Sequence, residues 1–296
     1  MTVKGIIYKA VGGYYYVKTD TGQIECRARG RFRIEGITPL VGDMVEIELT
    51  SDGKGYIKSV SPRRNSFVRP PVANLDVLAI VISAAPPVTD RFMIDTMAAV
   101  AFHKNIEPII VINKCDLDRG DGFFSIYKKC GIQCVRTSAV TGEGTDELVC
   151  MLKGKVSAFS GNSGVGKSSL LNRIDPRLGL KTGQINEKIG RGRHTTRHVE
   201  LLDLPNGATV ADTPGFSSFD TMEMDLIDKN SIQFAFPEFA PYIGMCRFTG
   251  CAHDKDKGCA VRAAVENGEI SVERYNSYVR MYRAAKEYKE WEHRPK

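Results

Sequence analysis

The sequence has no apolar run long enough to cross a membrane. The longest, Val77 to Ile82, has only the length of a buried strand. The first residues, Met1 to Gly5, lack the apolar stretch and small-residue cleavage site of a secretory signal. Internal repeats and low-complexity tracts are also missing. These absences argue against a secreted or membrane-spanning chain, and we expect a cytoplasmic protein with no membrane partner that acts as a monomer.

Composition indicates an ordinary globular protein of two or three domains. The 296 residues are 42% hydrophobic and 26% charged, which is typical of chains that bury a sizeable core. The net charge of +6 is uneven, because residues 1–70 carry 12 basic and only 7 acidic side chains. An excess of this kind favours a polyanionic partner such as nucleic acid over a charge that only aids solubility.

Periodicity divides the chain into a β-rich start, an α/β middle and a helical end. Residues 1–62 hold five short apolar or β-branched runs with turn signals between them, which predict a small barrel of the OB-fold type or, alternatively, the SH3-like type. We expect those strands at residues 5–10, 14–19, 23–29, 43–49 and 55–60. Residues 63–73 are expected to be a basic linker. From residue 74 buried strands alternate with helices, as in a sheet covered on both faces.

A phosphate-binding loop is predicted where a strand at 155–159 gives way to a helix at 167–174. Gly161, Gly166, Lys167 and Ser168 have the spacing of the G-x-x-x-x-G-K-S motif. In such a loop backbone N–H groups surround the phosphates, the lysine reaches the β- and γ-phosphates, and the hydroxyl binds Mg²⁺. The predicted loop comprises Gly161, Asn162, Ser163, Gly164, Val165, Gly166, Lys167, Ser168 and Ser169.

A guanine-reading motif is predicted at the end of the apolar strand 108–112. Asn113, Lys114 and Asp116 form Asn-Lys-x-Asp, in which the carboxylate can accept two hydrogen bonds from guanine. Adenine would leave that carboxylate unpaired, which is costly. Ser138 and Ala139, at another strand end, match a second guanine loop whose backbone N–H meets the base. Together with the phosphate loop these motifs favour GTP over ATP.

The motifs stand in an unusual order. Ordinary GTPases place the phosphate loop first, whereas here the base reader precedes it and Asp212-Thr213-Pro214-Gly215 comes last. This order indicates a circularly permuted GTPase. Asp212 is expected to bind Mg²⁺ through water and Gly215 to contact the γ-phosphate, while Thr195 or Thr196, in a Gly-rich basic switch segment, completes the metal shell.

A glutamine that orients the attacking water is missing after Asp-x-x-Gly, where Phe216 stands instead. Slow intrinsic hydrolysis is therefore expected. His194 could position the water, although it could equally contact RNA or the sheet edge.

Three cysteines and a histidine near the C-terminus predict a structural zinc site. Cys246, Cys251, His253 and Cys259 lie within 14 residues. Three thiolates and one imidazole make a closed tetrahedral site for Zn²⁺ with no open position for catalysis. The alternative interpretation is that these are unrelated thiols. We interpret the five remaining cysteines as unrelated thiols.

Basic side chains near the barrel could bind RNA. If residues 27–33 stay extended, alternation places Arg27, Arg29, Arg31 and Arg33 on one face, where they could follow a phosphate backbone. Arg63 and Arg64 in the predicted linker are further candidates. A C-terminal helix carrying Arg274 on a cationic face is either another such surface or a solvated face with balanced charge.

Taken together, these motifs resemble the RsgA family, circularly permuted GTPases of small ribosomal subunit biogenesis. The resemblance rests on the base reader, the phosphate loop, the segment Gly192 to Thr196, the segment Asp212 to Phe216 and the zinc pattern, and it spans nearly the whole chain. It implies an OB-fold at 1–62, a permuted G domain at 74–220 and a zinc-binding helical domain at 221–296.

The same resemblance implies binding of GTP and GDP with Mg²⁺, one structural Zn²⁺, and hydrolysis stimulated by the small (30S) subunit and its rRNA late in maturation. Two alternatives stay open from the residues themselves. One is an RNA-binding scaffold with a structural nucleotide, and the other is a permuted GTPase acting on another RNA or on a protein.

Overall fold

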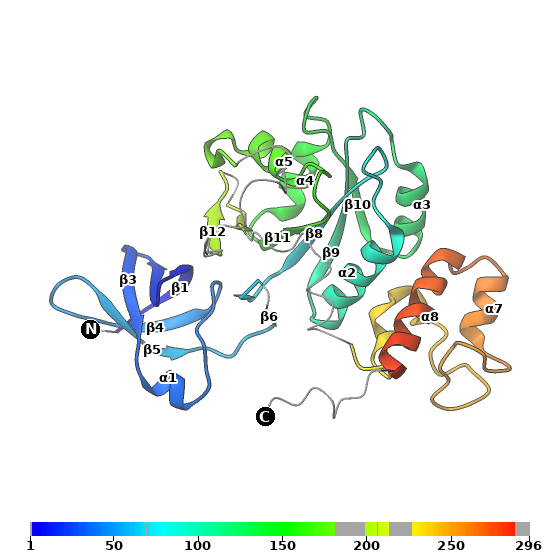
Figure 1. Ribbon diagram of the computed structural model, residues 1–296, viewed down its shortest axis with the longest axis horizontal. Helices are drawn as coiled ribbons and strands as arrows, with labels where there is room; N and C mark the ends of the chain where they lie inside the picture. Colours follow the sequence, from blue (N-terminus) through cyan, green and yellow to red (C-terminus); the bar gives the residue numbers. More distant parts are fainter. Residues whose placement is uncertain (1, 69, 181–198, 206, 213–226, 288–296) are drawn as a thin grey trace, which may run out of the picture.

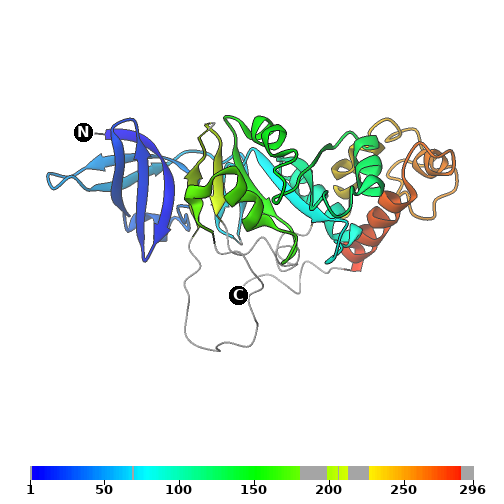
Figure 2. The ribbon, with the colours of Figure 1, turned by 90° about the horizontal axis from the view of Figure 1, so that it is seen from above.

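The protein is built as three units in a row. The computed structural model describes residues 2–68, 70–180, 199–205, 207–212 and 227–287. A β-barrel lies at one end, an α/β unit in the middle and a helical unit at the other end (Figure 1, Figure 2). Among the helices in these ranges, none is both long enough and apolar enough to span a bilayer.

The N-terminal unit is a closed five-stranded barrel. Strand β1 (Thr2–Val11) pairs with β2 (Tyr14–Thr19), β2 with β3 (Gly22–Ala28), β3 with β5 (Gly55–Val60), β5 with β4 (Met44–Leu49), and β4 returns to β1. Alternate side chains point inward, and the core includes Ile7, Val17, Cys26, Ile47 and Ile57. The five predicted strands are therefore present, and the closed barrel is OB-like, as predicted.

The predicted row of arginines is wrong. Only Arg27 lies on β3, which ends at Ala28, and the short helix α1 (Arg31–Ile34) follows. The period of two is lost because the chain turns at Gly30 to bury Phe32, which is 3% exposed. Burial of one aromatic ring outweighs the extended pattern of the arginines around it.

The middle unit is a largely parallel sheet. Strands β10 (Gln133–Arg136), β9 (Glu107–Asn113), β8 (Val77–Ser83), β11 (Val156–Ser160) and β13 (Thr209–Asp212) are parallel neighbours in that order. Strand β12 (Glu200–Asp203) is antiparallel to β13. Because the chain moves outward from β8 to β10 and then returns to β11 on the other side of β8, a crevice is expected at the carboxyl ends of β8 and β11.

Helices cover both faces of this sheet, as its unbroken apolar strands require. Leu78 and Ile80 of β8 belong to the core beneath α2 (Arg91–His103) and α3 (Asp121–Lys129). The intervening Ala79 and Val81 belong to a second core with α4 (Thr145–Leu152) and α5 (Lys167–Ile174). A short 3₁₀ turn, η1 (Pro176–Leu178), follows α5.

The barrel and the sheet are joined along a strand edge. β1 pairs with β12 at Lys9 and Glu200, whose side chains form an ion pair of 2.7 Å. The Tyr8 hydroxyl donates to Asp203 at 2.8 Å. The segment expected to be a linker contains a two-stranded sheet of β6 (Ser66–Phe67) and β7 (Val72–Ala73), so this connection is structured as well.

The C-terminal unit is helical, and two of its elements pack against α2. Its elements are η2 (Ile232–Ala235), η3 (Pro237–Phe239), α7 (Ala260–Glu266) and α8 (Val272–Glu287). Phe236, Phe239 and Tyr278 are buried, and Tyr278 meets both phenylalanines edge to face, with the Phe239 and Tyr278 ring centres 4.8 Å apart. These rings form the hydrophobic centre of the unit.

Helix α8 is anchored by a buried arginine rather than presenting it to a partner. The Arg274 side chain is 0% exposed and lies 2.9 Å from Asp95 of α2 and 2.7 Å from Glu238 of η3. Tyr127 of α3 donates to the same Asp95 at 2.9 Å. The predicted cationic face is therefore wrong for Arg274. Two carboxylates and a ring above it offset the cost of burying the guanidinium.

Replacing Arg274 with alanine is expected to destabilise the protein by about 3–5 kcal/mol, because Asp95 and Glu238 would stay buried without a cation. Urea unfolding curves would measure this change. Arg283 on the same helix provides the matched control, since it pairs with Asp254 while its own side chain is 53% exposed. Its alanine variant is expected to cost less than about 1 kcal/mol. Equal costs for the two variants would contradict the anchoring role.

Candidate functional site

The phosphate-loop sequence lies at the carboxyl end of β11 and leads into α5. Two of its glycines are required by close contacts. A Cβ on Gly161, whose φ is +137°, would lie 2.1 Å from the Val81 carbonyl oxygen, and one on Gly166, whose φ is +94°, would lie 2.4 Å from Asn113 Nδ2. The loop therefore packs directly against the ends of β8 and β9, with its backbone N–H groups near the start of α5.

Lys167 closes this loop on itself. Its Nζ donates to the carbonyl oxygens of Gly161 at 2.6 Å and Asn162 at 2.9 Å. Burial lowers the pKa of Lys167 to about 8. A phosphate beside Nζ would favour the charged form and raise that pKa again. The lysine is thus held where an anion would stabilise it most.

Asn113 connects the base-reading loop to the phosphate loop. Its buried Nδ2 donates to the Val165 carbonyl at 2.8 Å, across 52 residues of sequence. Its Oδ1 accepts from Thr137 Oγ1 at 3.2 Å, and the Cys115 N–H donates to the Thr137 carbonyl at 3.1 Å. One amide side chain therefore brings together the ends of β9, β10 and β11, which lead into three of the loops that were predicted to bind the nucleotide.

Lys114 and Asp116, the two residues of this motif that should meet the base, lie in different environments. Lys114 has a left-handed φ of +63°, and its Nζ donates to the Pro86 carbonyl at 3.0 Å. Asp116 is exposed. This leaves the Asp116 carboxylate accessible at the carboxyl edge of the sheet, where a ring with two adjacent N–H donors could bind it.

Hydrogen bonds tie the second base loop together. Ser138 is buried, and its Oγ accepts from the N–H groups of Val140 at 3.2 Å and Thr141 at 3.1 Å. The carbonyl of Ser138 accepts from Gly142. Ala139 lies between these fixed points and is half-buried. Its backbone is consequently held in one conformation beside Asn113 and Thr137.

Both predicted switch segments lie outside the described residues. His194, Thr195 and Thr196 belong to the first, and Gly215 and Phe216 to the second. Asp212 is placed at the end of β13, although its side chain is not described. Strands β12 and β13 therefore form the hairpin that connects the two predicted switches.

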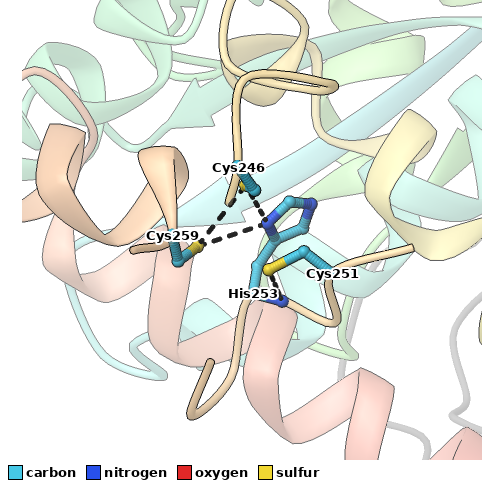
Figure 3. Close-up of side chains that lie close together, drawn as sticks. All are labelled: Cys246, Cys251, His253 and Cys259. Carbon is cyan, nitrogen blue, oxygen red and sulfur yellow. Dashed lines mark hydrogen bonds between the residues drawn. The ribbon is translucent and has the colours of Figure 1, made fainter. Parts of the chain in front are cut away.

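The predicted metal ligands come together in one cluster (Figure 3). The His253 Nδ1 atom lies 3.5 Å from Cys246 Sγ and 3.4 Å from Cys259 Sγ, and those sulfurs are 3.9 Å apart. Zn–S bonds of about 2.3 Å and Zn–N bonds of about 2.0 Å imply tetrahedral edges of roughly 3.5–3.8 Å. Cys251 completes a group whose ligand atoms all lie within 4.8 Å of one another. The cluster could therefore hold a metal.

The surroundings of the cluster also suit a metal. Gln233 Oε1 lies 3.0 Å from His253 Nε2, an arrangement that leaves Nδ1 free to face the sulfurs. Backbone N–H groups of Ala260 and Arg262 donate to the sulfurs of Cys246 and Cys259. Burial raises the pKa of the Cys251 thiol to about 12, which a bound cation would reverse. Gln233 could not be found from the sequence, because nothing in its local pattern sets it apart.

Several of the arginines proposed to bind RNA have partners within the protein. Arg63 bonds the buried Asp43 through Nε at 2.8 Å, and Arg64 lies 2.6 Å from Asp76. Arg29 pairs with Glu48, and Arg31 donates to the Lys58 carbonyl at 2.6 Å. Arg63 thus helps to hold the chain after β5 against the barrel. The side chain of Arg33 is not described.

Two family models match almost the whole of the first two units. The RsgA N-terminal domain matches residues 4–57 and the RsgA GTPase matches residues 60–222. Proteins called small ribosomal subunit biogenesis GTPase RsgA are 47% identical in Caldanaerobacter subterraneus subsp. tengcongensis, over 96% of each chain, and 46% identical in Geobacillus kaustophilus, over 97% of this chain and 98% of the relative.

Solved structures give the same result. YjeQ from Thermotoga maritima superposes with a TM-score of 0.84 at 36% identity, covering 98% of this chain and 100% of the other. YloQ, described as a circularly permuted GTPase, superposes with a TM-score of 0.80 at 34% identity, covering 100% and 97%. The similarity therefore extends through the C-terminal unit, beyond the two family models.

Proposed function

Since the chain belongs to the RsgA family of circularly permuted GTPases, we propose that it hydrolyses GTP to GDP and phosphate on the small ribosomal subunit during that subunit's late maturation. The observation that carries the proposal is the hydrogen bond from Asn113 to Val165, which joins the base-reading loop to the phosphate loop. The names of the relatives supply the partner. A cytoplasmic location, where subunits are assembled, and action as a monomer are part of the proposal.

Recognition of guanine is assigned to the loops after β9 and β10. Asp116 would accept from the N1–H and the exocyclic amine of the base, while Lys114 would lie along the ring plane. The backbone of Ser138 and Ala139 would meet the guanine oxygen. The exposed position of Asp116 and the hydrogen-bonded turn at Ser138 support this assignment. Adenine lacks the donor pair and would leave the carboxylate unpaired.

Binding of the triphosphate is assigned to residues 161–169. The backbone from Gly161 to Gly166 would surround the phosphate oxygens, with Lys167 moving from its carbonyl partners to the β- and γ-phosphates. Ser168 would bind Mg²⁺, together with Asp212 and with Thr195 or Thr196. Mg²⁺, when bound, offsets the charge on the phosphates. The closed, partly desolvated lysine supports this assignment, because an anion would relieve its burial.

Hydrolysis is assigned to the predicted switches, which lie outside the described residues. Gly215 would contact the γ-phosphate and His194 would hold the attacking water. The glutamine of ordinary GTPases is replaced by Phe216. We therefore propose a slow intrinsic reaction that needs the small subunit for full speed.

We assign a structural role to the C-terminal unit and contact with rRNA to the N-terminal barrel. We propose that Cys246, Cys251, His253 and Cys259 bind one structural Zn²⁺, and that the barrel of residues 1–62 contacts RNA. Residues 63–73 would connect it to the G domain at 74–220, with the zinc-binding unit at 221–296. The tetrahedral spacing of the cluster and the basic excess of residues 1–70 support these roles.

Adding small ribosomal subunits is expected to raise the rate of GTP hydrolysis by at least tenfold, whereas large subunits should leave it unchanged. The physical reason is that Phe216 stands where ordinary GTPases have the glutamine that orients water, so the bound subunit must help to position that water. Phosphate release under single-turnover conditions measures the effect. The His194→Ala variant should bind GTP normally and lose most of the stimulation.

Equal rates with and without small subunits would contradict the proposal. That outcome would favour a scaffold in which the nucleotide is structural. Stimulation by another RNA or by a protein, and not by the small subunit, would favour a permuted GTPase with a different partner.

A further inference from the structure

The outer face of the barrel carries a row of two tyrosines with an arginine between them. Tyr14 of β2 pairs with Arg27 of β3, and Arg27 pairs with Tyr56 of β5, so the three lie side by side across neighbouring strands. Their neighbours Cys26, Gly55 and Ile57 point into the barrel, because each is buried. Alternation along the strands then places all three members of the row on the outside.

Arg27 and Tyr56 of this row are exposed, and the arginine lies over the half-buried Tyr14. Tyr56 is 43% exposed, and the Arg27 guanidinium lies over the Tyr14 ring at 4.5 Å while donating to the Tyr14 hydroxyl. One face of the guanidinium therefore covers a tyrosine. Arg27 itself is exposed, so the other face is accessible. Two interstrand spacings, roughly 10 Å, separate the two tyrosines.

Charge on this face favours an anionic ligand. The nearest carboxylates, Glu25 and Glu48, are each paired with a cation, Lys54 at 2.9 Å and Arg29 respectively. Lys58 is exposed and follows Tyr56 on the same side of β5. Aromatic rings and a planar cation among excess positive charge are the features on which unpaired nucleotides stack.

We propose that Tyr14, Arg27 and Tyr56 form a stacking platform for unpaired RNA bases. This inference rests on the proposed function, which brings the barrel to rRNA, and it replaces the arginine row that the sequence suggested. Stacking on this platform tolerates any base, because each base has a π-face. Side chains around the row supply the charge for the backbone phosphates.

Anisotropy of a fluorescein-labelled uridine dodecamer, measured at several KCl concentrations, tests the platform. Tyr14→Leu and Tyr56→Leu are each expected to weaken binding by about 5- to 150-fold, with the salt dependence unchanged. Tyr56→Phe keeps the ring and should bind like the parent. Arg27→Lys keeps the charge and should still weaken binding several-fold, because the planar face is lost.

A matched control lies in the C-terminal unit. Phe234 is 66% exposed, and Phe234→Leu should leave dodecamer binding unchanged. Circular dichroism and GTP affinity, equal to those of the parent, would show that each variant is folded. A duplex of the same length should be insensitive to the two leucine variants.

Parent-like binding by both leucine variants, or no dodecamer binding by the parent, would overturn the platform. So would an effect seen only with whole subunits, since unpaired bases alone would then not suffice to occupy this face. Stimulated GTP hydrolysis is measured on the same samples. If stimulation survives while the leucine variants bind RNA normally, the platform is wrong and the GTPase assignment stands. If the parent shows no stimulation, the proposed function itself has failed.

Discussion

Replacing Cys251 with serine is expected to abolish metal binding and to unfold the loop from Met245 to Cys259. Structural zinc contributes about 10–16 kcal/mol of apparent folding free energy in small zinc-binding peptides. Within the loop Met245 and Phe248 are exposed and the buried side chains are largely the ligands themselves, so apart from the metal it is held mainly by hydrogen bonds from α8, such as those of Tyr275 and Tyr278 to its carbonyl oxygens. Loss of the cation would also leave the buried Cys259 thiol without its metal partner.

Two measurements check this expectation. The metal released by a mercurial reagent should fall from one Zn²⁺ per chain to none, and amides 245–262 should lose nearly all protection from hydrogen exchange. Helix α8 should keep part of its protection, because Arg274 ties it to α2 independently of the cluster. Cys150→Ser is the control, since Cys150 is exposed and lies outside the cluster. A Cys251→Ser protein that retains one zinc and its protection would contradict the structural role.

Changing Asp116 to asparagine is expected to weaken GTP binding by about 10²- to 10⁴-fold and to create affinity for xanthosine triphosphate. The carboxylate would lose two charge-assisted hydrogen bonds to guanine, each about 1.5–3 kcal/mol. An asparagine amide can instead donate to the C2 carbonyl of xanthine, which replaces the guanine amine. Titration calorimetry with both nucleotides measures the exchange.

Asp118 provides the matched control for this change. It is also an exposed aspartate of the same loop, but its Oδ1 accepts from the Gly120 N–H at 2.8 Å and so caps the turn before α3. Asp118→Asn should therefore leave the preference for guanine unchanged. If Asp116→Asn kept that preference, or if the parent bound ATP as well as GTP, the base-reading assignment would be wrong.

Periodicity predicted most of the fold. Helices α2 and α5 begin and end at the residues that the pattern indicated, because each lies between clear signals: Asp90 caps α2, and Gly166 opens α5. The buried strands of the sheet were equally clear, since uninterrupted apolar runs such as Val77 to Ile82 have few other structures available.

The failures share a physical cause, which is that a charged side chain does not reveal its partners in sequence. Arg274 was expected to be at the surface, but two carboxylates 36 and 179 residues away make it the best-buried cation described. Nor did the sequence indicate that Arg63, a candidate for contact with RNA, bonds the buried Asp43. Only the folded chain brings such partners together.

The pairing of β1 with β12 has a practical consequence for work on fragments of this protein. A nucleotide-binding fragment cut free of its barrel would carry β12 as an unprotected outer strand, with backbone donors and acceptors available to any other chain. Such fragments would tend to pair with one another through that strand and precipitate. Covering this strand edge is therefore a role that we expect of the barrel independently of any contact with RNA.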